Sequence, residues 1–487
     1  MKNIMDIMRG DPGLYRGRLE TDSRKVRSGD IFVAIKGTVH DGHEYIREAL
    51  ERGAAGVVCE HAPAGLSSGM KGKIALVKDS RRALGDMAKR VFGDPSGHLS
   101  VYGVTGTNGK TTTVFLIDSI LNSAGISSGF ISTVFTKTYG DVLNRSVMTT
   151  PDILVLNRCL SDLAEHGGKA AVVEISSHAL EQQRISGIEL NSAVFTNLTP
   201  EHLDYHGTMA KYLKDKSMIF GNLKPGGTAV LNADDPLVSG LIKTLEFPSL
   251  VTFALRGEAH VKGENVRLSP YGSEFDITVR DAGSVHIRTG LIGEHNIYNM
   301  LGAVSALLNS GIRLEDMKEG LEKARPVPGR LDAVATDAPF RVFVDYAHTP
   351  NALENVLGCL RALTGGKLIC VFGCGGDRDR TKRPVMGDLA TSICDNVVMT
   401  NDNPRTEKPG DILRQIEKGV SDKNNYCIIE DRHDAIKSAL SIAGDGDIVV
   451  IAGKGHEEHQ IIGGDITHFN DKEVALGILE EMGYRAG

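Results

Sequence analysis

Short apolar runs rich in valine and isoleucine recur along the chain and alternate with stretches of helical pattern. The runs that predict strands lie at 30–35, 56–59, 170–175, 192–196, 227–232, 340–345, 367–372, 396–400 and 447–452. Apolar strands that alternate with helices are typical of parallel sheets covered on both faces. The pattern therefore predicts an α/β protein built on parallel sheets.

Polar and Pro/Gly-rich segments divide this pattern into three predicted domains. Gly93–Gly97 predicts a linker, and Arg325–Arg330 predicts a hinge. Residues 251–292 alternate in the manner of an antiparallel appendage, and a helix is predicted over 296–309. We expect a small α/β N-terminal domain over 1–97, a central parallel-sheet domain over 98–327 and a Rossmann-like C-terminal domain over 328–487.

Composition narrows the class of protein. A length of 487 residues fits about three domains of roughly 150 residues, and 41% apolar with 24% charged residues is ordinary for a soluble chain. The net charge of −7 argues against nucleic-acid binding. No apolar run is long enough to span a bilayer or to form a signal-peptide core. The seven cysteines form no CxxC pair, which indicates free thiols.

The most specific motif is a glycine loop between a predicted strand and a predicted helix. The run Val101–Thr105 leads into Gly106-Thr-Asn-Gly-Lys-Thr111, and helical pattern continues from Thr112. Glycines let successive N–H groups point at phosphate oxygens, and the helix N-terminus adds positive charge. Lys110 can reach the β- and γ-phosphates, and the following threonine can bind Mg²⁺. The spacing departs from the strict Walker A pattern, but a nucleoside triphosphate site is favoured over a plain turn.

Four further polar features of the central domain leave alternatives open. Glu174 ends a strand and suits Mg²⁺, although such a residue is more often a surface cap. His202 and His206 have zinc-like spacing without a third ligand, so a polar loop and a contact to a second Mg²⁺ or a phosphate both remain. Lys216 fits a solvated lysine-rich helix face, whereas the segment His295–Asn299 fits a purine clamp and a helix cap equally well.

The predicted C-terminal domain is polar at the points where its strands end. Asp345 and His348 follow one strand, and a glycine loop with mixed charges spans Phe372–Arg383. Asn401–Thr406 combines a carboxylate, amides and a guanidinium, and Ala452–Glu457 is a further glycine loop. Arginine makes bidentate hydrogen bonds with carboxylates, and aspartate accepts hydrogen bonds from ammonium groups. These strand ends therefore predict a small substrate that bears both charge signs.

This ordered set of motifs resembles the Mur ligases, the ATP-dependent amide-forming enzymes of peptidoglycan precursor synthesis. The similar segments occur in the family's order across all three predicted domains: Val104–Thr112, Glu174–His178, His202–His206, His295 with Asn299, Gly329–Arg330 and Asp345–Pro350. The resemblance implies three domains, with ATP bound by the central one.

The resemblance also implies the roles of individual residues. ATP would be bound by Gly106, Thr107, Asn108, Gly109, Lys110, Thr111, Thr112, His295, Asn299, Arg330 and Asp345. Mg²⁺ ions would be held by Thr111, Glu174, His202 and Lys216, the lysine being a carbamate formed from CO₂. The implied catalytic residues are Lys110, Glu174, His202, Lys216, Arg330 and Asp345.

Two motifs, Asp22–Arg24 and Asp402–Arg405, resemble the branch of the family that adds meso-2,6-diaminopimelate. A UDP-N-acetylmuramoyl dipeptide would be bound by Thr21, Ser23, His40, Asp41, Thr149, Thr150, Ser176, Gln182 and Arg184. Met148 stands where relatives can have asparagine. Diaminopimelate would be bound by Arg378, Asp402, Asn403, Pro404, Arg405, Gly453 and Glu457. Lysine-adding relatives lack the arginine that Arg405 matches, and lysine has no distal carboxylate for it to grip.

These similarities imply phosphorylation of the D-glutamate γ-carboxylate by ATP, attack by the diaminopimelate amine and closure of the domains during the reaction. We expect a monomeric enzyme of the bacterial cytoplasm that acts on small molecules without membrane insertion. Three alternatives remain: a lysine-adding homologue, a folylpolyglutamate synthetase, and a nucleotide-switched binding protein that has lost catalysis.

Overall fold

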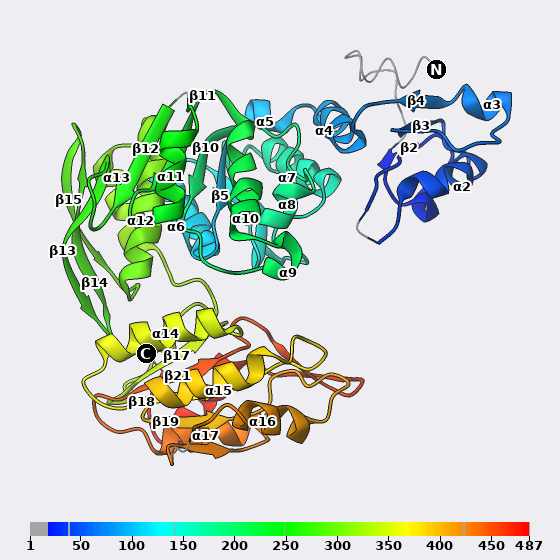
Figure 1. Ribbon diagram of the computed structural model, residues 1–487. Coiled ribbons are helices and arrows are strands. Elements are labelled where there is room, and N and C mark those ends of the chain that lie inside the picture. Colours follow the sequence, from blue (N-terminus) through cyan, green and yellow to red (C-terminus); the bar gives the residue numbers. More distant parts are fainter. Residues whose placement is uncertain (1–17, 38, 141, 248, 422–423, 487) are drawn as a thin grey trace. The chain divides into compact units, whose positions relative to one another are not determined.

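The computed structural model describes residues 18–37, 39–140, 142–247, 249–421 and 424–486 (Figure 1). The chain folds into two compact units. Among the described residues, the first holds those from 18 to 264, 277–285 and 298–321, and the second holds 265–276, 286–297 and those from 322 to 486. The expectation about a signal peptide concerns the N-terminal segment, which lies outside the described residues.

A small parallel sheet opens the first unit. Its strands follow the order β1-β2-β3-β4: β1 (Leu19–Glu20), β2 (Ile31–Val33), β3 (Gly56–Cys59) and β4 (Ile74–Leu76). Its helices are α2 (Ile46–Glu51), α3 (Ser68–Lys71) and α4 (Ser80–Val91). Successive side chains of a strand point to opposite faces. One face therefore packs on α4 and the other on α2.

The largest sheet has eleven strands in the order β15-β14-β13-β12-β11-β10-β5-β9-β6-β7-β8. Their bounds are β5 (Ser100–Thr105), β6 (Ser128–Ile131), β7 (Phe135–Tyr139), β8 (Val142–Arg145), β9 (Ala170–Glu174), β10 (Leu190–Phe195), β11 (Leu223–Asn232), β12 (Ser249–Ala254), β13 (Val261–Ser269), β14 (Gly272–Val279) and β15 (Gly283–Thr289). The run from β6 to β12 is parallel, and its strand ends therefore meet at one edge.

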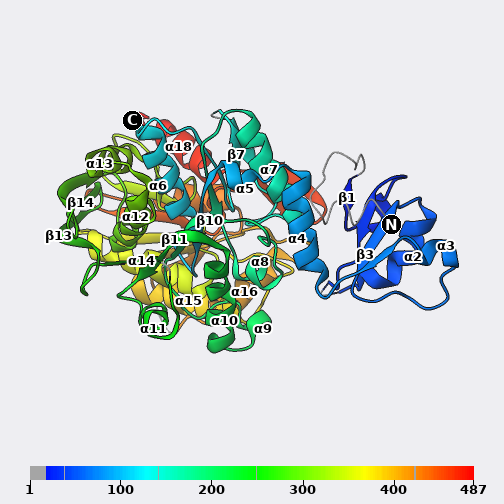
Figure 2. The same ribbon diagram turned by 90° about the horizontal axis from the view of Figure 1, so that it is seen from above.

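The helices around this sheet are α5 (Pro95–His98), α6 (Lys110–Ser123), α7 (Ile153–Glu165), α8 (Ser177–Glu181), α9 (Leu203–His206), α10 (Met209–Ser217), α11 (Pro236–Thr244), α12 (Glu294–Leu307) and α13 (Leu314–Lys323). The predicted linker Gly93–Gly97 contains the start of α5, because Asp94 caps that helix and Pro95 occupies its first turn. Within the first unit, α4 packs beside α7 (Figure 2).

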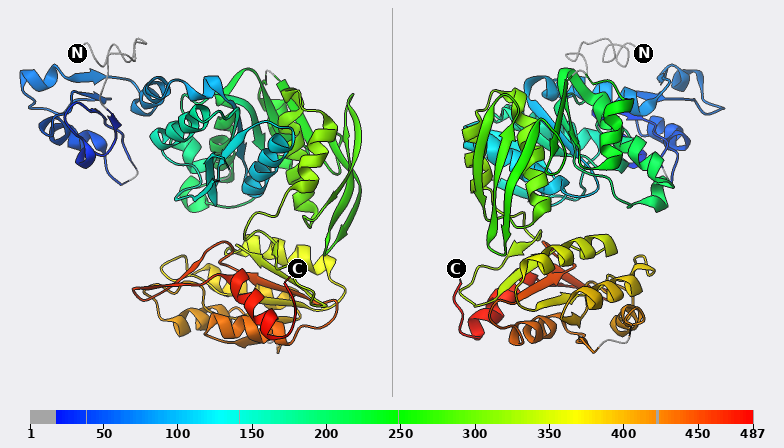
Figure 3. Two further views of the ribbon diagram at one scale, coloured as in Figure 1. Left: turned by 180° about the vertical axis from the view of Figure 1, so that it is seen from behind. Right: turned by 60° about the vertical axis from the view of Figure 1, so that its left-hand side comes forward.

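The antiparallel appendage predicted over 251–292 covers fewer residues than expected. β12 pairs in parallel with β11 and with the start of β13, where Phe253 faces Val261. Short turns join β13 to β14 and β14 to β15, as antiparallel neighbours require. These long strands form one edge of the sheet (Figure 3). Their alternating pattern belongs to this edge, while β12 continues the parallel part.

A doubly wound sheet forms the core of the second unit. Its strands follow the order β16-β17-β21-β18-β19-β20: β16 (Asp332–Ala333), β17 (Arg341–Asp345), β18 (Leu368–Phe372), β19 (Asn396–Met399), β20 (Tyr426–Ile428) and β21 (Ile448–Ala452). Its helices are α14 (Pro350–Leu363), α15 (Lys382–Ile393), α16 (Pro409–Glu417), α17 (Arg432–Ser441) and α18 (Asp471–Glu481). The first three cover one face, and α17 with α18 cover the other.

A separate hairpin, β22 (His459–Ile462) with β23 (Asp465–His468), follows β21. The α/β fold class predicted from the sequence is confirmed, with one main sheet in each predicted domain. The boundaries at 97/98 and 327/328 stay a prediction. In the described part of the chain, no helix combines the length and apolar character that crossing a membrane requires.

Candidate functional site

The glycine loop between β5 and α6 closes tightly on its neighbours. Gly106 and Gly109 have φ values of +147° and +83°, which favour glycine. A Cβ atom at Gly106 would collide with the Thr196 hydroxyl, and one at Gly109 would collide with the Asn299 side-chain oxygen. The sequence therefore needs glycine at both positions, and the loop can bring its backbone close to a phosphate group.

Hydrogen bonds from the end of β10 hold this loop. The Asn108 N–H donates to Asn197 Oδ1 at 2.9 Å, and the Asn108 carbonyl accepts from Thr196 Oγ1 at 2.7 Å. Lys110 Nζ donates to the Thr107 carbonyl at 2.9 Å, so the ammonium lies over the loop. Sequence reasoning missed Asn197, whose only signal was its place after a predicted strand.

Glu174 is a buried carboxylate and not a surface cap. Its side chain lies at the end of β9, and the residue is 1% exposed. Thr111 Oγ1 donates to Oε2 at 3.0 Å, while the Thr133 N–H and hydroxyl donate at 2.8 and 2.9 Å. A carboxylate beside threonine hydroxyls is an oxygen donor set that suits Mg²⁺. Thr133 was missed because it lies 41 residues from Glu174 in sequence.

Lys216 is buried, which contradicts its interpretation as part of a solvated face. It lies on α10 with 1% exposure, whereas Lys214 of the same helix is exposed. Lys216 Nζ donates to the Gly106 carbonyl at 2.5 Å and lies 4.7 Å from the centre of the Tyr212 ring. Burial, and then the charge of Lys110, lowers the pKa of Lys216 well below its usual range.

The two histidines of the segment 202–206 have different environments. His202 has φ +54°, its side chain is about half exposed, and partial burial lowers its pKa. His206 is buried, with Nδ1 2.7 Å from Asp215 Oδ2 and Nε2 2.9 Å from Ser177 Oγ. Both ring nitrogens of His206 are therefore engaged, which disfavours a zinc site shared by the pair.

Another histidine–carboxylate group includes Asp41, one of the residues predicted to bind the UDP-dipeptide. Asp41, His43 and His61 have possible ligand atoms within 4.8 Å of one another. However, His43 Nδ1 lies 2.6 Å from Asp41 Oδ1, and His43 Nε2 accepts from the Glu60 N–H at 3.0 Å. His43 therefore has no lone pair left for a metal.

A cavity of about 360 Å³ in the first unit collects several residues predicted to bind the dipeptide substrate. Thr21, Gln182 and Arg184 line it together with Met148 and Arg81, and the latter was not predicted. Arg184 donates to Gln182 Oε1 and, at 2.9 Å, to the Thr150 carbonyl.

The other residues predicted for this substrate do not line that cavity. Ser23 is buried and its hydroxyl lies 3.1 Å from Glu48, while Asp41 caps a short turn. Thr149 Oγ1 lies 3.0 Å from Thr133 Oγ1, and Ser176 caps α8. His40 is exposed.

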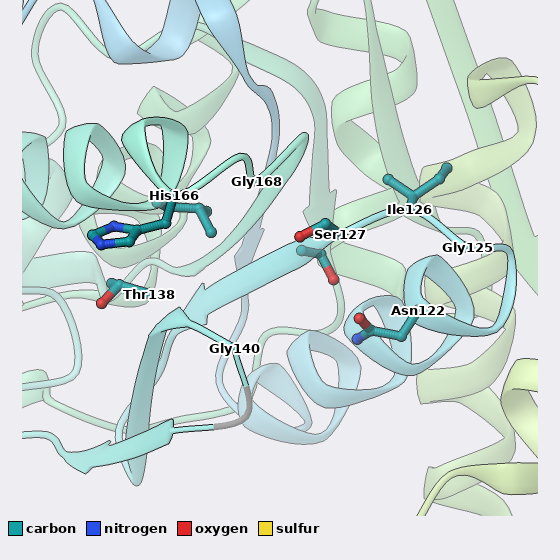
Figure 4. A pocket seen from close by; sticks show the side chains of 10 residues that line it. Asn122, Gly125, Ile126, Ser127, Thr138, Gly140, His166 and Gly168 are labelled. Carbon is teal, nitrogen blue, oxygen red and sulfur yellow. The ribbon is translucent and has the colours of Figure 1, made fainter.

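A second cavity of about 340 Å³ lies at the amino ends of β6 and β9 (Figure 4). Asn122, Ser127, Thr138 and His166 are among its lining residues. None of the predicted site residues lines this cavity.

The predicted ATP residues are divided between the two units. Gly106–Thr112 and Asn299 belong to the first, whereas His295, Arg330 and Asp345 belong to the second. Asp345 accepts from the Leu331 and Ala347 N–H groups at 2.7 and 2.8 Å.

Burial raises the pKa of Asp345. The Arg330 guanidinium lies 5.1 Å from the Tyr346 ring centre, in cation–π contact. His295 is exposed in the first turn of α12.

The second unit presents a polar loop after β19. Asp402, Asn403 and Pro404 are buried, and Arg405 has φ +54°. Arg405 Nη1 donates to the Gly376 carbonyl at 2.7 Å, so the loop contacts the glycine-rich turn after β18.

Two neighbouring strand ends complete this surface. Gly453, after β21, has φ +116°, and a Cβ atom there would come within 2.7 Å of the Asp402 carboxylate. Arg378 is exposed in the turn after β18.

Two buried arginines stabilise this region, and sequence reasoning missed both roles. Arg383 pairs with both oxygens of Glu407 at 3.0 and 2.9 Å, and these hydrogen bonds lower the pKa of Glu407 to about 2. Arg432 makes a bidentate pair with Asp471. Its guanidinium also donates to the carbonyl of Asn401, just after β19, at 3.0 Å and to that of Ala452, the last residue of β21, at 3.1 Å. In the sequence, Arg383 stands at the end of a glycine loop with mixed charges that is expected to contact the substrate, and no partner within the protein is predicted for it.

Comparisons with known proteins cover nearly the whole chain. Residues 18–92 match the model of the Mur ligase family, catalytic domain, 104–307 that of the Mur ligase middle domain, and 329–455 that of the Mur ligase, glutamate ligase domain. A relative from Halalkalibacterium halodurans is named UDP-N-acetylmuramoyl-L-alanyl-D-glutamate--2,6-diaminopimelate ligase. It is 43% identical over 478 residues, which cover 98% of this chain and 96% of the relative.

Solved structures agree with this result. A UDP-N-acetylmuramoyl-L-alanyl-D-glutamate--2,6-diaminopimelate ligase is 34% identical with a TM-score of 0.72, covering 96% of this chain and 95% of its own. The MurF ligase from Thermotoga maritima, solved in complex with ADP, shares the fold at 20% identity with a TM-score of 0.61, covering 96% and 98%. The identity and coverage together establish that this chain belongs to the Mur ligase family.

Proposed function

We propose that this protein uses ATP to join meso-2,6-diaminopimelate to the D-glutamate γ-carboxylate of UDP-N-acetylmuramoyl-L-alanyl-D-glutamate. The relative from H. halodurans carries the proposal, because it bears this activity in its name and is 43% identical over 98% of the chain. The loop Asp402–Arg405 supports it, since the loop offers a carboxylate and a guanidinium at one sheet edge. We propose a monomer that acts in the bacterial cytoplasm.

The first chemical step makes the acceptor carboxylate reactive. A γ-carboxylate oxygen attacks the γ-phosphorus of ATP, and the bond between that phosphorus and the oxygen of the β-phosphate breaks. The products are ADP and an acyl phosphate on the glutamate side chain. The glycine loop at 106–111 would hold the phosphates through its N–H groups and Lys110. The positive charge of Arg330 would stabilise the negative charge on the transferred phosphoryl group. Asp345 would hold the backbone turn that carries Arg330, because it accepts from the Leu331 N–H.

The second step forms the amide. The neutral amine of diaminopimelate attacks the acyl carbon, the carbon–oxygen bond to phosphate breaks, and the amine loses a proton to solvent or to a nearby base. Inorganic phosphate is the product that an assay can follow.

Mg²⁺ fits the donor set of the first unit. Thr111, Glu174, His202 and a carbamate on Lys216 would hold two such ions, which would offset the repulsion between the triphosphate and the substrate carboxylate. A neutral amine and CO₂ give a carbamate and a proton. Lys216 is 1% exposed, an environment that disfavours its charged form. Carbamylation would replace a buried cation with an anionic oxygen ligand.

Selection of the amino acid would rest on Arg405. Its guanidinium has a planar fork that matches a carboxylate, and diaminopimelate carries a distal carboxylate that lysine lacks. Asp402 and Glu457 would accept from the neighbouring ammonium group. This arrangement favours the diaminopimelate-adding function over the lysine-adding alternative.

Phosphate release tests the proposal directly. Purified protein receives ATP, Mg²⁺ and UDP-N-acetylmuramoyl-L-alanyl-D-glutamate with meso-diaminopimelate, L-lysine or no amino acid. We expect release that depends on diaminopimelate, and a preference reduced at least about tenfold in Arg405→Lys, which keeps the charge and loses the fork. A preference for lysine in the unaltered protein would overturn the assigned substrate. Failure with both amino acids, together with turnover of a folate, would favour the synthetase alternative.

A further inference from the structure

A fully buried lysine lies beneath the residues proposed to recognise the amino acid. Lys454 follows Gly453 in the loop after β21 and is 0% exposed. Its Nζ donates to the His459 carbonyl at 2.5 Å and lies 3.3 Å from Asn403 Oδ1 and 3.4 Å from Glu457 Oε2. An ammonium group has three donors, so these three acceptors satisfy it.

The Asn403 amide is engaged inside the protein. Asn403 is 1% exposed, and its Oδ1 accepts from the Ile461 N–H at 2.9 Å as well as from Lys454. Its Nδ2 donates to Glu457 Oε2 at 2.7 Å. Asn403 therefore connects other groups of the site and has little capacity left to bind a substrate.

Glu457 is held asymmetrically by these contacts. Asn403 and Lys454 both donate to Oε2, and the Glu457 side chain keeps 25% exposure. Two donors on one oxygen fix the carboxylate plane and leave Oε1 as the oxygen able to accept from a ligand. A buried ammonium beside it also offsets the cost of desolvating the carboxylate.

The same network ties the Asp402–Arg405 loop to the β22–β23 hairpin. The Arg405 N–H donates to the Ile461 carbonyl at 3.0 Å, and the Gly463 N–H donates to the Arg405 carbonyl at 2.7 Å. Gln460 Nε2 donates to the Asp402 carbonyl at 3.0 Å. Lys454 and Asn403 lie where the loop, the hairpin and Glu457 meet.

We propose that Lys454 is a positioning residue for the amino-acid substrate. It turns Glu457 so that Oε1 faces the substrate ammonium, and it holds the Asp402–Arg405 loop in register with the hairpin. This inference rests on the proposed function, because that function assigns the amino-acid substrate to these residues.

Steady-state kinetics of Lys454→Met test the inference, since methionine keeps the length of the side chain and removes the ammonium. We expect KM for diaminopimelate to rise about 10–100-fold because Glu457 and Asn403 lose a buried donor. KM for ATP and for the UDP-dipeptide should stay within about twofold. Lys437→Met, which removes an exposed lysine paired with Glu481, is the matched control and should leave all three constants unchanged.

A double-mutant cycle separates positioning from a general structural role. If Lys454 acts through Glu457, KM for diaminopimelate in the double variant Lys454→Met, Glu457→Gln should be less than about threefold higher than in Glu457→Gln alone. Fully additive losses, or an equal rise in the constants of all three substrates, would overturn the inference. Lys454→Gln, which retains a donor, serves if Lys454→Met does not fold, and its rise in KM should be smaller than that of Glu457→Gln.

The two proposals fail in distinguishable ways. Absence of diaminopimelate turnover by the unaltered protein contradicts the proposed function. The cycle is then run with the amino acid that the protein does use, and a KM effect confined to that amino acid still supports the role of Lys454.

Discussion

Two buried basic side chains, Arg383 and Lys216, have different kinds of partner, and each leads to a different prediction. Arg383 is paired with Glu407 through two hydrogen bonds. Lys216 donates to a backbone carbonyl, and burial lowers its pKa. The first arrangement contributes to stability, whereas the second disfavours the charged form of the lysine that we propose to be carbamylated.

Under the proposed function, Lys216→Ala should lower the rate of phosphate release at least about 100-fold, because it removes the side chain that would carry the anionic metal ligand. Formate or acetate should restore part of the activity, since a small carboxylate can enter the space of the lost side chain. Lys214→Ala, on the exposed side of the same helix, should retain full activity. Full activity of Lys216→Ala would contradict the carbamate role.

Glu407→Gln should lower stability in a pH-dependent manner. The pKa of Glu407 falls from 4.5 to about 2 in the folded protein, because of its hydrogen bonds with Arg383. A lowered pKa gives stability that is present above about pH 4.5 and is lost as the pH falls toward 2. Breaking this buried pair should cost about 3–5 kcal/mol at pH 7.

Denaturation of Glu407→Gln and of the unaltered protein between pH 2 and 7 measures that difference. It should shrink steadily below about pH 4.5. Glu481→Gln, at an exposed ion pair, serves as the control and should have little effect at any pH. A difference that does not change with pH would contradict the role assigned to the Arg383–Glu407 pair.

At the scale of elements, the buried parallel strands were the most predictable part of the fold. β3 begins and ends where its apolar run predicted, because a strand covered on both faces carries apolar side chains throughout. The hairpins β7–β8 and β22–β23 were not predicted. All four residues of β8 are exposed, so no apolar run marks this strand.

The candidate site was predictable only where its residues are contiguous in the chain. The glycine loop at 106–111 could be recognised because its function depends on local backbone geometry. The sequence gives no comparable signal for Thr133, Asn197 and Lys454, because their contacts join segments that lie far apart in the chain. Burial reversed the sequence-based expectation for Lys216 because the sequence around it, with three other charged residues within five positions, looks like a solvated face.

At the scale of the whole molecule, the chain folds as two compact units that have separate hydrophobic clusters. Proteins with more than one such unit depart from two-state unfolding. All residues predicted to bind the UDP-dipeptide lie in the first unit, from Thr21 to Arg184. A ligand that binds only the folded form of one unit stabilises that unit by mass action.

Differential scanning calorimetry should therefore resolve two transitions, and the UDP-dipeptide should raise only one of them. At a concentration 100-fold above its Kd, the stabilisation is about 2.7 kcal/mol, enough to move a midpoint by several degrees. Arg184→Ala should abolish the shift, because this residue lines the cavity and donates to Gln182 and Thr150. A single transition, or an equal shift of both, would show that the two units unfold cooperatively and that the dipeptide stabilises the chain as a whole.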